Sequence, residues 1–222
     1  MDILYRDDEL AVVNKPSGLL THKSTWSGPA DDAAVQQARD ALGVHVWPVH
    51  RLDRQTSGAL LFALSAEVAA RMQEAFEAGL VEKRYLAIAR GVVPGEVHVD
   101  HPIPRGEGKP RAPAVTDFRR VAVDALSRAS LVEAFPRSGR FHQVRRHLAH
   151  LRHPIGGDSN YGTGWFNRFM RAEVGLPRLA LHAASLRLPA RSGEVFVSAP
   201  VPADLEGAIA RLFGTGIDKS RV

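Results

Sequence analysis

The chain has 222 residues, 45% of them hydrophobic, and it carries a formal charge of +5 without a single cysteine. These values favour one globular α/β or α+β domain that binds a polyanion, nucleic acid first, and they exclude disulfides, thiolate metal sites and a cysteine nucleophile. The N-terminus lacks the basic-then-apolar order of a signal peptide, and no apolar run approaches the roughly 20 residues of a membrane span. We therefore expect a cytoplasmic protein that is not a membrane protein.

The first part of the chain predicts two short strands, a helix and a third strand. Apolar runs at residues 3–5 and 10–13 flank an acidic turn, as is typical of a strand pair. Over residues 31–42 the apolar residues recur at helical spacing, and Gly43 follows as a stop signal. The third strand is expected over residues 44–49.

Residues 50–58, HRLDRQTSG, predict a tight polar loop that enters a buried strand over residues 59–64. Asp53 lies between Arg51 and Arg54, and neighbouring positive charge favours the ionised form of a carboxylate. Such a carboxylate can act as a nucleophile or a base at neutral pH. The alternative is a surface loop with a structural Asp–Arg pair.

The middle of the chain alternates between helix and strand signals. Ser65 is placed to cap a helix that ends at Gly79, and the apolar face of this helix predicts core packing. Residues 105–113, RGEGKPRAP, predict a mobile loop that is either a solvated connector or a phosphate contact. Strands are expected over residues 85–89, 115–120 and 130–135.

Residues 137–154 are the most basic stretch and predict a helix that ends before Pro154. His147 and His150 lie one helical turn apart, which is one possible spacing for metal ligands. Arginines crowd this stretch, however, and no carboxylate or cysteine is near to offset a divalent cation. RNA contact or structural hydrogen bonding explains these histidines better, and we expect no metal.

The C-terminal part interleaves aromatic and cationic residues over 163–178, which suits either a packed helix or an RNA contact, and we favour the helix. The remaining patterns predict two strands, an amphipathic helix and a frayed tail, over residues 179–188, 195–199, 205–213 and 215–222.

Five segments together resemble the motifs of the RluA-type pseudouridine synthases, and they follow the order of that family. They are NKPSG (14–18), HRLDRQTSG (50–58), KRY (83–85), GRFHQVRRHL (139–148) and HPIGGD (153–158). The resemblance implies an α+β fold with a mixed, mostly antiparallel central sheet, flanking helices and an RNA-binding cleft. It also implies a single catalytic domain over residues 1–222, without an N-terminal S4-like domain.

The resemblance assigns three catalytic roles. Asp53 matches the family's nucleophile, Tyr85 matches the tyrosine that stacks on the target uracil, and Arg145 matches the arginine that pairs with the aspartate. The implied reaction converts a uridine in RNA to pseudouridine after base flipping, and it needs no cofactor and no metal. Substrate contacts are implied for Arg51, which would enter the gap left by the flipped base, and for Arg54, Lys83, Arg140, His142, Gln143 and Val144.

The implied substrate is transfer RNA, with ribosomal RNA second. NKPSGLLTHKSTW and the segment that follows GRFHQV resemble the branch of the family that modifies position 65 of transfer RNA. A monomer without an obligate protein partner is expected. Two other classes stay open: a catalytically silent RNA-binding module, and a nuclease or glycosidase. A pure binder has no need of a charged catalytic carboxylate, and glycoside hydrolysis usually uses two.

Overall fold

The protein is described by a computed structural model that covers residues 1–22, 32–104, 108–126, 128–191 and 193–214. Its internal contacts divide the chain into two compact units. Unit 1 comprises Met1–Glu82 and Ala183–Pro200, and unit 2 comprises Lys83–His182 and Val201–Val222. The single catalytic domain stays a prediction, and the predicted tail over 215–222 lies outside the described residues.

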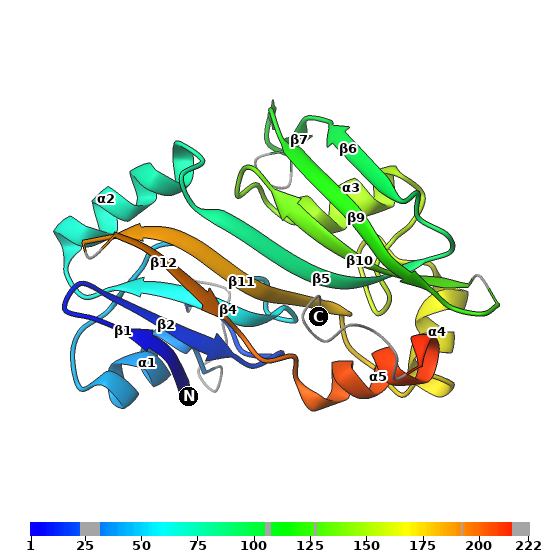
Figure 1. Cartoon of the computed structure of the whole chain (residues 1–222), viewed down its shortest axis with the longest axis horizontal. Coiled ribbons are helices and arrows are strands. Elements are labelled where there is room, and N and C mark those ends of the chain that lie inside the picture. The colour runs from blue at the N-terminus through cyan, green and yellow to red at the C-terminus, as the bar shows by residue number, and fades with distance from the viewer. Residues whose placement is uncertain (23–31, 105–107, 127, 192, 215–222) are drawn as a thin grey trace. The chain divides into compact units, whose positions relative to one another are not determined.

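The described residues of unit 1 form antiparallel strand pairs and two helices (Figure 1). Its strands follow the order β1-β2-β4-β11, with β12 paired to β11 and β3 paired to β4. The elements are β1 (Asp2–Arg6), β2 (Leu10–Lys15), α1 (Ala34–Leu42), β3 (Trp47–Pro48), β4 (Ser57–Ala63), α2 (Ala66–Glu77), β11 (Leu181–Ala190, which begins in unit 2) and β12 (Gly193–Ser198).

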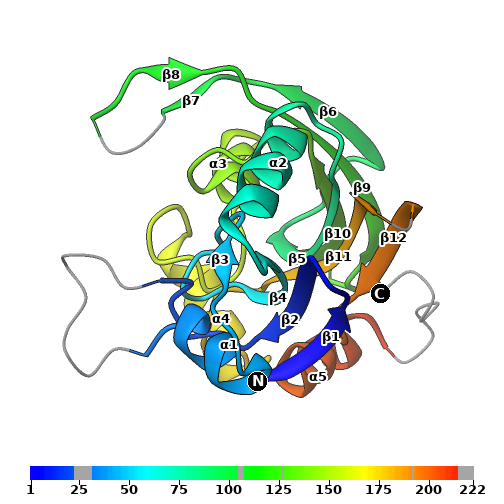
Figure 2. The ribbon, with the colours of Figure 1, turned by 90° about the vertical axis from the view of Figure 1, so that its left-hand side faces the viewer.

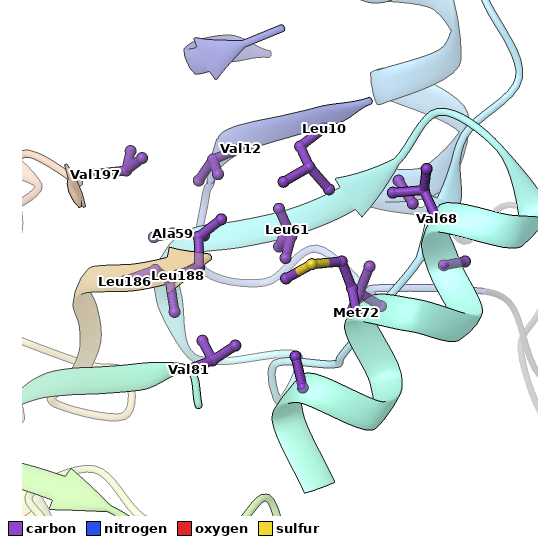
Figure 3. Close-up of a cluster of buried hydrophobic side chains, with 14 of the residues drawn as sticks. Leu10, Val12, Ala59, Leu61, Val68, Met72, Val81, Leu186, Leu188 and Val197 are labelled. Atoms are coloured by element: carbon purple, nitrogen blue, oxygen red, sulfur yellow. The ribbon is translucent and has the colours of Figure 1, made fainter. Parts of the chain in front are cut away.

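The core of unit 1 forms around β4, in which every residue is buried. In Figure 3, Leu61 of β4 and Met72 of α2 lie side by side within this core. Ser65 caps α2 as predicted, since its hydroxyl accepts a hydrogen bond from the backbone N–H of Val68 at 3.2 Å. Because β4 is buried along its whole length, it anchors the C-terminal end of the loop that precedes it.

In unit 2, the part of the chain that the structure describes contains the antiparallel order β5-β10-β9-β6 and three helices. Helix α3 contacts β9 and β10, while β7 and β8 form a separate ribbon that extends from the end of β6 (Figure 2). The elements are β5 (Glu82–Arg90, which begins in unit 1), β6 (Glu96–Asp100), β7 (Ile103–Pro104), β8 (Arg111–Ala112), β9 (Val115–Val123), β10 (Ala129–Pro136), α3 (Gln143–His150), α4 (Gly164–Ala172) and α5 (Ala203–Phe213).

The predicted α+β class is confirmed, and the expected helices are found, including α4 with Phe166, Phe169 and Met170 buried. The strand predicted over 44–49 is wrong in length and shrinks to Trp47–Pro48, because proline has no N–H to extend a ladder. Strand β6 was not predicted, since it buries only Val99 and so shows a weak pattern.

The predicted loop over 105–113 is wrong in part, because Arg111 and Ala112 form β8 opposite β7. Ala112 is buried, so this end of the segment packs as a strand, whereas Arg105 lies outside the described residues. Within the described part of the chain, no helix combines the length and the apolar character needed to cross a membrane.

Candidate functional site

The loop that carries Asp53 in unit 1 is a closed turn. The backbone N–H of Thr56 donates to the carbonyl oxygen of Asp53 at 3.0 Å. On the N-terminal side, the buried Thr21 hydroxyl donates to the Leu52 carbonyl at 2.9 Å and accepts from the Leu52 N–H at 3.1 Å. These bonds fix the backbone on both sides of a partly exposed carboxylate.

Lys15 of the NKPSG segment braces the same turn from inside the unit. Its ammonium group is fully buried and donates to the carbonyl oxygens of Pro16 at 2.9 Å, Leu19 at 2.7 Å and Arg54 at 3.2 Å. Gly18 and Arg54 add a reciprocal pair, with Gly18 N–H to Arg54 O at 2.8 Å and Arg54 Nε to Gly18 O at 2.9 Å. The NKPSG and HRLDRQTSG segments therefore form one hydrogen-bonded assembly.

The exit from the loop into β4 needs a glycine. Gly58 has φ +113°, and a Cβ there would overlap the backbone carbonyl of Ala183. His50 closes the other end, because its Nε2 accepts from the Leu61 N–H at 3.0 Å while its ring stacks on Phe76 at 4.9 Å. The position of Asp53 is thus set by backbone geometry within unit 1.

In unit 2 the KRY segment begins β5, where Tyr85 is half-buried and pairs with Ala134 of β10. Lys83 is buried, and this burial lowers the pKa of its ammonium group to about 8. Arg84 reaches the buried Glu133 carboxylate at 2.9 Å. Within this segment, Tyr85 is therefore half-buried in the sheet, Lys83 is buried, and Arg84 forms an ion pair.

Arg145 of α3 forms a buried, bidentate ion pair. Its Nε and one terminal nitrogen each lie 2.8 Å from the carboxylate of Asp158, and the same terminal nitrogen donates to Asn160 Oδ1 at 3.0 Å. Burial by itself raises the pKa of Asp158, but Arg145 and the backbone N–H groups of Asn160 and Tyr161 outweigh it and lower this pKa below its ordinary value. Asp158 is thus a charged partner of Arg145, a role that the match of its segment to a family motif did not reveal.

Gln143, predicted to contact substrate, uses its amide inside unit 2. Its nitrogen donates to the Val115 carbonyl at 2.9 Å and to the Thr116 hydroxyl at 3.1 Å. Its oxygen accepts from the Ser138 hydroxyl at 2.7 Å and from the Arg140 backbone N–H at 3.0 Å. Gln143 is buried, and these bonds join the start of α3 to β9.

His147 continues this network and is also buried. Its Nε2 donates to the His101 carbonyl at 2.9 Å, and its Nδ1 lies 2.9 Å from the Thr116 hydroxyl. Burial lowers the pKa of this imidazole, so the neutral form dominates near pH 7. Both ring nitrogens thus serve structural hydrogen bonds.

The remaining predicted contact residues surround the start of α3. His142 has φ +55°, its Nδ1 lies 3.1 Å from the Tyr161 hydroxyl, and its ring stacks on Phe141 at 3.7 Å. Val144 is buried, and the exposed Arg140 donates through Nε to the Pro113 carbonyl at 3.3 Å. Tyr161 was not singled out from the sequence, yet the guanidinium groups of Arg145 and Arg146 lie 5.2 Å and 5.1 Å from its ring centre.

The structure thus gathers Arg145, His142, Gln143 and Val144 at one end of α3 in unit 2, and it places Arg51, Asp53 and Arg54 on one turn of unit 1. The ion pair between Asp53 and Arg145 stays a prediction, as does stacking of Tyr85 on uracil.

Comparison with known proteins adds independent information. The family model described as RNA pseudouridylate synthase matches residues 9–150. A protein of Haemophilus ducreyi called tRNA pseudouridine synthase C is 45% identical over 205 residues, which cover 84% of each chain. One of the same name from Vibrio vulnificus is 38% identical over 222 residues, covering 90% of this chain and 91% of the relative.

Solved structures agree with this. Human RNA Pseudouridylate Synthase Domain Containing 4 superimposes with a TM-score of 0.78 at 28% identity, covering 95% of this chain and 92% of its own. Human RNA Pseudouridylate Synthase Domain Containing 1 gives a TM-score of 0.73 at 31% identity, over 90% and 83% of the two chains.

Proposed function

Because the chain belongs to the RNA pseudouridylate synthase family, in its RluA group, we propose that it converts a uridine of transfer RNA to pseudouridine. The relatives that match over most of their length are named for activity on transfer RNA. The proposed target is position 65, and the protein is proposed to act as a cytoplasmic monomer.

In the proposed mechanism, the target uridine leaves its stack and Asp53 acts at C1′ of the ribose while the N-glycosidic bond breaks. The released uracil rotates and its C5 bonds to C1′ in place of N1; the C5 proton is lost and N1 takes up a proton, so that the product is an isomer. Arg145 orients and balances the charge of Asp53, and Tyr85 stacks on the base, which replaces part of the stacking lost on flipping. Arg51, exposed on the Asp53 turn, would fill the gap in the RNA.

The observation that carries this proposal is the network of hydrogen bonds that holds the Asp53 turn. A nucleophile gains from being held in one geometry before substrate arrives, and the buried Lys15 ammonium group holds this turn by the carbonyl of Arg54. A loop that served only as a solvated connector would not require a buried cation at its base.

The structure changes the role that we propose for one residue. Gln143 spends its amide nitrogen and oxygen on four hydrogen bonds within unit 2. We therefore assign it to positioning the start of α3, next to Val144 and Arg145, and not to direct RNA contact. Arg54, Lys83, Arg140 and His142 keep their proposed contacts with substrate.

The test uses transfer RNA with tritium at uracil C5, and it compares wild type with Asp53→Asn and Asp40→Asn. Asp40 is an exposed carboxylate on α1 of the same unit, so its variant controls for the change of charge. Wild type and Asp40→Asn should release tritium at equal rates, and Asp53→Asn should release none. Mapping of the product then identifies the position.

Each other outcome has a definite meaning. Release from ribosomal RNA alone would replace the proposed substrate. Strand scission would identify a nuclease, and silence on both RNAs with retained binding would identify a binding module. Equal tritium release by wild type and Asp53→Asn would remove Asp53 from the mechanism.

A further inference from the structure

Unit 2 contains a pocket of about 200 Å³ between the β7–β8 ribbon and helix α3, the two elements seen near each other in Figure 2. It includes none of the proposed catalytic residues. Its polar walls are His101, Arg111, Arg146, His147, His150 and Tyr161, and the rest of its lining is proline, isoleucine and alanine.

The side chains that line the pocket concentrate positive charge. Arg111 and Arg146 are permanent cations, the imidazoles of His101 and His150 can each donate a hydrogen bond, and among the residues that the structure describes no carboxylate belongs to the lining. The Nε of Arg146 is buried and has no hydrogen-bond partner among the described residues. A concave site whose described residues include two arginines and no acid is complementary to an anion.

The walls are held in place by contacts within the unit. The rings of His101 and His150 stack with their centres 3.9 Å apart and their planes at 16°. One Arg111 nitrogen lies 3.2 Å from His101 Nε2 and donates to the Pro102 carbonyl at 2.9 Å. His147 ties the His101 carbonyl to α3 at 2.9 Å. The cationic groups are therefore arranged before any ligand arrives.

Neighbouring positive charge in the pocket disfavours protonation of its histidines, and a bound anion would offset this effect. Burial lowers the pKa of His101, and the nearby His150 and Arg111 lower it further. An anion between these groups would reverse the effect of the two neighbours. The arrangement therefore favours the occupied pocket over the empty one.

The volume limits the class of ligand. Sites for whole cofactors and similar molecules measure about 300–1,000 Å³, so a pocket of about 200 Å³ suits a fragment such as one phosphate group. In nucleic-acid complexes, contacts to phosphate fix register and orientation without reading sequence.

We propose that this pocket binds one backbone phosphate of the substrate RNA, at a nucleotide other than the target uridine, through Arg111, Arg146 and the His101–His150 pair. This inference rests on the proposed function for the identity of the RNA. Tyr161 connects the pocket to the proposed catalytic residue Arg145, because the guanidinium groups of both Arg146 and Arg145 lie over its ring. A phosphate held here sets the register of the strand with respect to Arg145.

The experiment measures the affinity of the full-length protein for transfer RNA over a series of salt concentrations, together with the single-turnover rate at saturating RNA. Arg111→Gln and His150→Ala are the test variants, because both residues are exposed and their loss should leave the fold intact. Arg171→Gln is the control, since it removes an exposed charge from α4, which lies apart from the ribbon in Figures 1 and 2.

Arg111→Gln should weaken binding roughly three- to tenfold, for transfer RNA and for unrelated RNA alike, and should reduce the slope of log Kd against log salt by about 1. His150→Ala should weaken binding in the same direction. The single-turnover rate of both variants at saturating RNA should fall, because RNA bound without this phosphate contact loses its register with respect to Arg145. Arg171→Gln should change none of these quantities.

An unchanged salt slope and affinity in Arg111→Gln would overturn the proposal. So would inorganic phosphate that raises the thermal stability of wild type but not of Arg111→Gln while their RNA affinities stay equal, since that result would assign the pocket to free phosphate. Wild type that binds RNA but makes no pseudouridine would defeat the proposed function alone, because the salt slopes would still report on the pocket.

Discussion

The ion pair between Arg145 and Asp158 gives a prediction that separates stability from catalysis. Arg145 is 6% exposed and Asp158 is 1% exposed, and two hydrogen bonds of 2.8 Å join them. Replacing Asp158 by asparagine removes the carboxylate that accepts two hydrogen bonds from the buried Arg145 guanidinium group. Removal of one member of a buried pair costs about 3–5 kcal/mol, so Asp158→Asn should lower the free energy of unfolding by this amount.

A second variant restores the balance of charge. Asparagine keeps Oδ1, the atom that accepts from the backbone N–H groups of Asn160 at 2.9 Å and Tyr161 at 3.1 Å in the wild type. The double variant Arg145→Met with Asp158→Asn therefore has no charge at either of these two buried positions and retains these two bonds. We expect it to recover stability relative to either single variant, with a coupling energy of about 1–3 kcal/mol.

Urea unfolding of the four proteins measures this cycle, and tritium release from transfer RNA measures the chemistry. The double variant should be stable and inactive, because methionine cannot pair with Asp53. A loss below about 1 kcal/mol in Asp158→Asn would show that the buried pair is not a major contributor to stability. Activity in the double variant would remove Arg145 from the mechanism.

The ion pair between Arg145 and Asp158 also predicts a loss of stability at low pH. The pKa of Asp158 is below its ordinary value of 3.8, so the folded protein binds its proton less readily than the unfolded chain does. The stabilisation is therefore fully present above the ordinary pKa and is lost as the pH falls through the lowered one. The stability difference between wild type and the double variant should shift against wild type on acidification below about pH 4, and a difference independent of pH would contradict this assignment.

Two further predictions concern the Asp53 turn. Gly58→Ala should lower the free energy of unfolding by about 1–3 kcal/mol from backbone strain, and by more from overlap of the new Cβ with the Ala183 carbonyl. The control Gly207→Ala lies in α5, where a Cβ meets nothing, and it should raise the free energy of unfolding by up to about 1 kcal/mol. Urea midpoints of the two variants that move in the same direction would contradict this prediction. Lys15→Met should lower the free energy of unfolding by at least about 2 kcal/mol, because it leaves buried carbonyl oxygens without a donor. The variant should also release tritium more slowly at saturating RNA. A normal rate would show that the turn keeps its shape without Lys15.

Local patterns were sufficient for most of the elements. A continuous apolar run predicts β4, and Ser65 with the apolar face that follows predicts α2, because capping and periodicity depend on residues within one or two turns. The resemblance to a family added what such patterns do not contain, namely the α+β architecture and the roles proposed for Asp53, Tyr85 and Arg145.

Tertiary structure decided which polar groups meet. Nothing local shows that Lys15 reaches the carbonyl of Arg54, 39 residues away, or that Arg145 forms an ion pair with Asp158. Likewise nothing local shows that the Gln143 amide donates to Val115 and Thr116 of β9. The physical reason is that a buried charge or amide must find its partners wherever the backbone brings them. The sequence by itself therefore determined the elements and the motif residues, and the fold determined which of these residues are held in place by buried partners.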